Sequence, residues 1–132
     1  NVTLQNQEWK VYLDRQREMD YQISRAGWTG DYPDPNTFLD MWTSWSQQNQ
    51  TGWADPKYDA LIRKAAITKD PNARLEVFQE AEEILMDQLP IIPIYIYTRV
   101  YALHPAVKNW HANVLDHHPW KHIDLDLSLL KK

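Results

Sequence analysis

Three Asp-Pro dipeptides constrain the fold of this 132-residue sequence more than any other feature. An aspartate side chain can accept the unpaired amide hydrogens at the start of a helix, and a proline in the first helical position has no amide hydrogen to leave unpaired. We therefore interpret the three aspartates as helix caps rather than as catalysts. Because asparagine caps a helix about as well as aspartate, this interpretation alone predicts that Asp34→Asn costs little ligand affinity. The dipeptides are Asp34-Pro35, Asp55-Pro56 and Asp70-Pro71.

Apolar residues recur at helical spacing after each of these pairs. The predicted helices run from Pro35 to about Trp42, from Pro56 to about Thr68 and from Pro71 to about Leu89. An additional amphipathic helix is predicted over Asn6–Glu18. The residues expected to be buried are Tyr58, Leu61, Ile62 and Ala65 in the second capped helix and Leu75, Phe78, Ala81, Leu85 and Leu89 in the third.

Alternating apolar and polar residues predict strands between and after these helices. The predicted strands are Val2–Leu4, Tyr21–Trp28, Ile91–Tyr101 and Ile123–Leu130. Pro93 gives the third of them an edge position or a bulge. This order of elements favours a mixed α/β (α+β) fold, in which the paired helices pack on one face of a sheet.

Composition removes several classes of function. The net charge is −4 and no basic cluster is present, so nucleic acid is not an expected partner. The sequence has no cysteine, which excludes disulfides, thiolate metal sites and cysteine nucleophiles. No nucleophile elbow, phosphate loop or dinucleotide fingerprint occurs, so we predict no catalytic residue and no cofactor.

The segment Arg25–Phe38 is the strongest candidate for a binding site. It reads RAGWTGDYPDPNTF, and we expect its glycines to adopt unusual backbone angles and its prolines to stiffen a bent loop. This loop presents Asp31 between Trp28 and Tyr32, and a carboxylate between aromatic rings suits a cationic or amphipathic small ligand. The alternative is an ordinary strand-to-helix connection with a core tryptophan.

Two other chemistries are weaker candidates. Trp28 with Asp31, Asp34 and Asp40 resembles the cleft of a carbohydrate-binding or carbohydrate-cleaving module. The five histidines all lie within His104–His122. His118 and His122 have a spacing that serves a metal only on a helix, and Pro119 opposes a helix there. We therefore predict no physiological metal site.

Four segments together resemble a known family. They are RAGWTGDYPDPNTFLDMW, LQNQEWKVYL, WADPKYDALI and FQEAEEILMDQLPIIPIYIY. Their content and order are similar to the C-terminal part of oligopeptide-binding proteins, the peptide-binding branch of the extracellular solute-binding proteins that serve ABC importers. The sequence is accordingly expected to be a fragment of a longer protein.

This resemblance implies a two-lobed fold of the periplasmic-binding-protein-like type II class, with a peptide held between the lobes and no enzymatic activity. Residues 1–98 would belong to the ligand-binding C-terminal lobe, and residues 99–132 would return to the other lobe. The implied partners are a peptide and the permease subunits of an ABC importer. The implied location is periplasmic or extracellular, with the parent protein soluble or lipid-anchored. We expect the fragment alone to dimerise or to exchange strands.

The resemblance also implies roles for single residues. Asp31 would hold the α-ammonium group of the ligand, with Trp28 and Tyr32 beside it. Trp9 would help to wall a side-chain pocket, and Arg25 would meet the ligand's carboxylate when the peptide length is suitable. A second basic residue found in the family on the preceding helix is not matched here, because Gln16 occupies that position.

Overall fold

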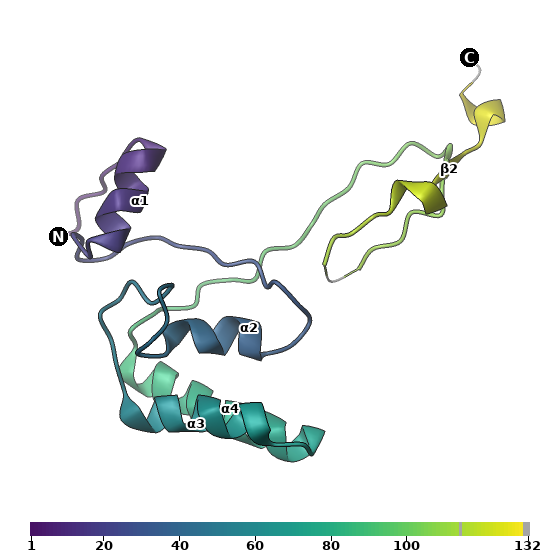
Figure 1. Cartoon of the computed structure of the whole chain (residues 1–132). Helices are drawn as coiled ribbons and strands as arrows, with labels where there is room; N and C mark the ends of the chain where they lie inside the picture. Colours follow the sequence, from purple (N-terminus) through teal and green to yellow (C-terminus); the bar gives the residue numbers. More distant parts are fainter. Residues whose placement is uncertain (114, 131–132) are drawn as a thin grey trace. The chain divides into compact units, whose positions relative to one another are not determined.

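The computed structural model describes residues 1–113 and 115–130 of the chain (Figure 1). It contains two compact units. The first consists of Asn1–Gly30 and Asp34–Ile92, and the second consists of Asp31–Pro33 and the chain from Pro93 onward. Within the predicted tail 99–132, Val114, Lys131 and Lys132 lie outside the described residues.

The first unit is built on a helical hairpin of α3 (Pro56–Ile67) and α4 (Pro71–Gln88), which lie side by side in Figure 1. Both predicted caps are confirmed. Asp55 accepts hydrogen bonds from the amides of Lys57 and Tyr58, and Asp70 accepts one from the amide of Ala73. The hairpin ends at Leu89, which adopts a left-handed conformation (φ 49°) immediately before Pro90.

The core of this unit lies between the two hairpin helices and α2. Its buried residues are Leu39, Tyr58, Ile62, Ala65, Val77, Phe78, Ala81 and Leu85. Most of the predicted core is confirmed, but the positions of Leu75 and Leu89 were predicted wrongly, since both are more than half exposed. Val77 is buried instead, because the buried residues of α4 must lie on the face of the helix that packs against α3.

The helix predicted from Pro35 to Trp42 is present as α2 (Asn36–Leu39) followed by the 3-10 helix η1 (Asp40–Trp42). Pro35, rather than Asp34, is its N-cap residue. Asp34 still accepts a hydrogen bond from the amide of Asn36 at 2.9 Å, so it contributes to the start of the helix without occupying the cap position.

The helix α1 (Trp9–Arg17) is shorter than the predicted Asn6–Glu18. Its N-cap residue is Glu8, whose carboxylate accepts hydrogen bonds from the amides of Lys10 and Val11. None of its residues is fully buried.

The second unit contains β1 (Val107–Lys108), η2 (Trp120–His122), β2 (Asp124–Leu125) and η3 (Leu127–Leu129). The two strands pair antiparallel, with Val107 opposite Leu125 and Lys108 opposite Asp124. Among the described residues this pair is the whole of the sheet structure.

The strand predictions for Val2–Leu4, Tyr21–Trp28 and Ile91–Tyr101 are therefore wrong for this structure, and Ile123–Leu130 forms a strand only at Asp124–Leu125. A strand requires a neighbouring strand for its backbone hydrogen bonds, and these described segments have none. No helix in the described parts of the chain has the length and apolar character needed to cross a bilayer.

Candidate ligand-binding site

The N-terminal half of the predicted binding loop is held against α2. The indole nitrogen of Trp28 donates a hydrogen bond to the carbonyl oxygen of Thr37 at 3.0 Å. Gly30 lies so close to Phe38 that a Cβ atom at Gly30 would come within 2.9 Å of the ring. The expectation of unusual backbone angles is wrong for Gly27 and Gly30, because neither has a positive φ. Gly30 is required for close packing instead.

The C-terminal half of the loop is held by an ion pair with α4. Both carboxylate oxygens of Asp34 accept hydrogen bonds from the Arg74 guanidinium, at 2.7 and 2.9 Å. Both side chains are about 70% buried, with exposed fractions of 31% for Asp34 and 28% for Arg74. The hydrogen bonds from Arg74 hold the pKa of Asp34 below its usual value. Asp34 is therefore more than a helix cap.

Trp9 and Arg25 are connected through Tyr12. The rings of Trp9 and Tyr12 stack with centroids 5.2 Å apart and an interplanar angle of 28°. The Tyr12 hydroxyl donates a hydrogen bond to the backbone oxygen of Arg25 at 2.7 Å. Trp9 remains 68% exposed, so most of its ring is available for a contact with another molecule.

The side chains of α1 that follow Tyr12 have their own partners. Gln16 donates a hydrogen bond to the Ser24 hydroxyl at 3.0 Å, which aligns α1 with the segment that leads into the loop. Arg15 pairs with Asp20 at 2.8 Å and Arg17 with Asp14 at 3.2 Å. Neither arginine takes the place of the basic residue that the family resemblance calls for at position 16.

Asp31 and Tyr32 are the remaining predicted site residues, and both are exposed. They fall in the second compact unit, whereas Trp9, Arg25 and Trp28 fall in the first. The five predicted residues are thus divided between the two units.

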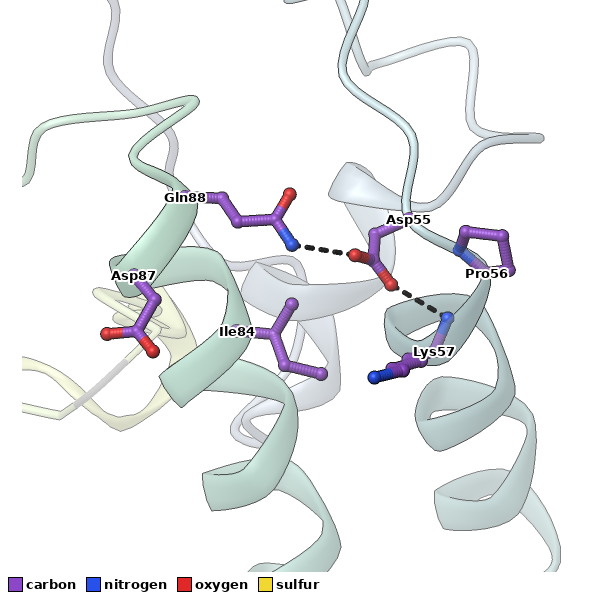
Figure 2. A pocket seen from close by; sticks show the side chains of 6 residues that line it. All are labelled: Asp55, Pro56, Lys57, Ile84, Asp87 and Gln88. Atoms are coloured by element: carbon purple, nitrogen blue, oxygen red, sulfur yellow. Dashed lines mark hydrogen bonds between the residues drawn. The ribbon is translucent and has the colours of Figure 1, made fainter.

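A surface pocket of about 370 Å³ lies elsewhere in the first unit, between the start of α3 and the end of α4 (Figure 2). It is lined by Asp55, Pro56, Lys57, Ile84, Asp87 and Gln88. Gln88 donates a hydrogen bond to Asp55 at 2.7 Å and accepts one from the Trp53 indole at 2.7 Å. These bonds join the start of α3 to the end of α4. None of the predicted site residues lines this pocket.

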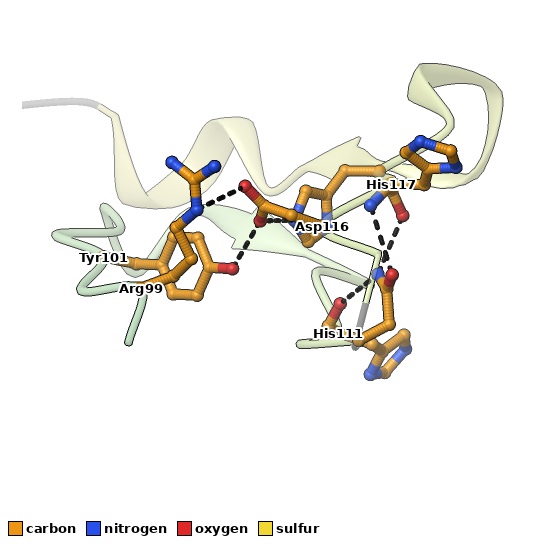
Figure 3. A network of polar contacts seen from close by, with 7 residues as sticks. Arg99, Tyr101, His111, Asp116 and His117 are labelled. Atoms are coloured by element: carbon orange, nitrogen blue, oxygen red, sulfur yellow. Dashed lines mark hydrogen bonds and ion pairs between the residues drawn. The ribbon is translucent and has the colours of Figure 1, made fainter. Parts of the chain in front are cut away.

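The second unit contains a polar network around Asp116 (Figure 3). Its carboxylate accepts a hydrogen bond from the Tyr101 hydroxyl, lies 2.9 Å from His118 Nε2 and forms an ion pair with Arg99 at 3.2 Å. Hydrogen bonds from Tyr101 and His118 hold the pKa of Asp116 below its usual value. The His118 ring also stacks on Trp110, with centroids 3.7 Å apart. Within the described residues, no cluster of three or more histidine or acidic side chains has the arrangement of a metal site.

Sequence reasoning missed the residues that fix the loop, namely Tyr12, Thr37, Phe38 and Arg74. One signal was present for Arg74, which is the single basic residue in the predicted helix Pro71–Leu89. An isolated cation on an acidic helix indicates a specific partner, but the partner lies forty residues earlier in the chain.

Comparisons with known proteins extend this description. No protein-family model matches the sequence. The dipeptide-binding protein DppE of Bacillus subtilis (strain 168) is 37% identical over 125 residues, which are 95% of this chain and 22% of DppE. The periplasmic murein peptide-binding protein MppA of Escherichia coli (strain K12) is 40% identical over 113 residues, 86% of this chain and 21% of MppA.

A solved structure gives the same result for the fold. The crystal structure of Haemophilus influenzae OppA in complex with the peptide RPPGFSPFR matches with a TM-score of 0.82 and 33% identity, over 95% of this chain and 25% of that one. The fold is therefore that of a part of the solute-binding proteins. The chain belongs to the family of oligopeptide- and dipeptide-binding proteins, and it spans about a fifth to a quarter of the length of these relatives.

Proposed function

We propose that this chain is a segment of an ABC-importer substrate-binding protein, which captures peptides between two lobes and delivers them to a membrane permease. The observation that carries this proposal is the match to H. influenzae OppA, whose solved structure holds a peptide. DppE and MppA are likewise named as peptide-binding proteins. They are named as binding proteins rather than as enzymes, and nothing in these comparisons favours the carbohydrate alternative.

Asp31 is the proposed partner of the peptide's α-ammonium group. A buried ammonium requires a negative partner and a wall that excludes water. Trp28 and Tyr32 flank Asp31 in the sequence and would supply that wall. Because the indole nitrogen of Trp28 already donates to Thr37, Trp28 would offer the face of its ring rather than a hydrogen bond.

Trp9 and Arg25 are the other proposed ligand contacts. Trp9 would wall a side-chain pocket with its exposed ring, whose orientation is set by stacking on Tyr12. Arg25 would meet the ligand's carboxylate, with its backbone held by the Tyr12 hydroxyl. Peptides of different sequence could then be held by their termini and backbone, while their side chains occupy hydrated pockets.

We further propose that residues 1–98 belong to the ligand-binding lobe and residues 99–132 to a return toward the other lobe. The division of the chain into compact units after Ile92 supports a boundary in this region. The proposed location is periplasmic or extracellular, as the name of MppA states for that relative, and the parent protein would be soluble or lipid-anchored.

Calorimetry on the full-length protein that carries this segment tests the proposal. We expect a tripeptide to bind and an oligosaccharide to give no heat of binding. Binding of the oligosaccharide without the tripeptide would contradict the proposal. The isolated 132-residue chain should bind the tripeptide weakly or not at all, because a cleft formed by two lobes loses many of its contacts when one is absent.

We propose that the isolated chain associates with a second copy of itself through the segment Ile91–Tyr101. Its apolar side chains Ile94, Ile96 and Val100 are more than 80% exposed. Apolar surface exposed in this way favours association with another chain. Light scattering should show a dimer that Ile96→Lys weakens, and a monomer at high concentration would contradict this proposal.

A further inference from the structure

We infer that Arg74, on α4, is a positioning residue for the peptide-binding loop and that it acts through Asp34. This inference rests on the proposed function, since it concerns the loop that carries Asp31. Arg74 lies outside the segment that the family resemblance identifies with the ligand. Its contacts nevertheless connect the rigid helical hairpin to the residue where that loop ends.

Arg74 is itself held in place on three sides. Its Nε atom donates to the backbone oxygen of Ala65 on α3 at 3.3 Å, and its guanidinium lies over the Phe78 ring at 4.5 Å from the centroid. Its two terminal nitrogens meet the two oxygens of Asp34. A planar guanidinium with this many contacts has one orientation, so it fixes the Asp34 carboxylate in both position and angle.

The other end of the loop is fixed independently. Trp28 is bonded to the backbone of Thr37, and Gly30 packs against Phe38. Only three residues, Asp31–Pro33, separate Gly30 from Asp34. Because both ends of this short span are attached to the first compact unit, few backbone conformations remain for the residues between them.

This restriction has a direct consequence for affinity. A carboxylate on a mobile loop must be ordered when the ligand binds, and the lost entropy reduces the affinity. A carboxylate on a loop that is fixed beforehand avoids most of that cost. Arg74 should therefore raise the affinity for peptides without touching the peptide.

Arg63 provides a matched control on the same helical hairpin. Its guanidinium lies over the Trp45 ring at 4.1 Å from the centroid, much as Arg74 lies over Phe78. Among the described residues, Arg63 forms no hydrogen bond or ion pair with the binding loop. Substitution by methionine retains the aliphatic contact in both cases and removes the charge.

The test is a double-mutant cycle in the full-length protein, with an unblocked tripeptide and isothermal titration calorimetry. Arg74→Met should weaken binding by about five- to tenfold when Asp31 is present and by less than about twofold in the Asp31→Asn background. Asp34→Asn should reproduce the loss. Arg74→Lys should lose part of the affinity, because an ammonium group cannot form the paired hydrogen bonds that the guanidinium donates to Asp34. Arg63→Met should bind the peptide like the wild type.

Each result decides the inference. An unchanged affinity of Arg74→Met, or an equal loss in both backgrounds, would overturn the positioning role and leave the proposed function standing. Failure of the wild type to bind any peptide would instead refute the proposed function, and the inference with it. Thermal melts of every variant identify unfolding, and Arg74→Lys and Asp34→Asn keep the test valid if Arg74→Met does not fold.

Discussion

Tyr58→Phe is the sharpest test of the core that supports the loop. Tyr58, on α3, is completely buried. Its hydroxyl donates a hydrogen bond to the backbone oxygen of Leu39 at 2.6 Å, which joins α3 to the end of α2. The ring also meets Trp53 edge-on, with centroids 5.0 Å apart. The substitution removes the hydroxyl and leaves the ring contacts in place.

The expected cost is that of one buried hydrogen bond, because the substitution removes the hydroxyl that donates to Leu39. Losing such a bond lowers the free energy of unfolding by about 0.5–1.5 kcal/mol. The effect should also depend on pH. Burial, with smaller contributions from Asp40 and Asp59, raises the pKa of Tyr58 far above its usual value of 10.0.

The sign of the pH effect follows from this raised pKa. Above about pH 10 the unfolded chain releases the Tyr58 proton while the folded chain keeps it. Stability is therefore fully present below about pH 10 and falls as pH rises, by about 1.4 kcal/mol per pH unit for this one proton. Tyr58→Phe removes this contribution to the dependence of the free energy of unfolding on pH.

Urea unfolding followed by circular dichroism measures both effects, on the wild type and on Tyr58→Phe, at about pH 8 and about pH 11. The variant should be less stable at the lower pH, and its deficit should shrink or reverse at the higher one. Tyr97→Phe, at a residue that is 60% exposed, is the matched control and should have a smaller effect. Parallel loss of stability with pH in wild type and Tyr58→Phe would refute the reasoning.

Two further substitutions test the loops of the first unit. Gly30→Ala places a Cβ atom 2.9 Å from the Phe38 ring and 3.0 Å from Thr37 Cγ2, so it should lower stability by about 1–3 kcal/mol in thermal melts, and Phe38→Ala should relieve part of the loss. A loss that Phe38→Ala leaves undiminished would argue against the Phe38 contact as its cause. Asn49 donates to the backbone oxygens of Trp42, Thr43 and Trp53, at 3.1, 3.3 and 2.8 Å. Asn49→Ala should therefore cost about 1–3 kcal/mol in urea unfolding, whereas Gln48→Ala should cost little, and equal effects would contradict this role for Asn49.

The parts of the fold that the sequence predicted are those controlled by nearby residues. Asp55 and Asp70 each bond to amides two or three positions away, so the signal for the helix start lies within a few residues. Tyr58, Ile62 and Ala65 repeat at helical spacing, which identifies the buried face of α3 without knowledge of its partner.

The incorrect predictions concern contacts between distant segments. The Asp34–Arg74 pair spans forty residues, and no local pattern distinguishes an aspartate that only caps from one that also binds an arginine. The alternation of Tyr21–Trp28 expresses only a local preference for a strand, and the prediction failed because a strand ladder needs a second strand. Of the candidate site, the sequence indicated the loop, while the contacts that hold its two ends involve Thr37, Phe38 and Arg74, which no local pattern connects with it.

The central claim is that Asp31 binds the α-ammonium group of the peptide. Its most direct test compares the affinity of the full-length protein for an unblocked tripeptide and for the N-acetylated form of that peptide. Both affinities are measured on the wild type and on Asp31→Asn. If Asp31 pairs with the α-ammonium group in a closed cleft, Asp31→Asn should weaken binding of the unblocked peptide by roughly 2–5 kcal/mol. Acetylation should weaken wild-type binding strongly and add little to the loss in Asp31→Asn, without a matching change in melting temperature. Equal binding of the acetylated and unblocked peptides to the wild type would contradict the assignment of Asp31.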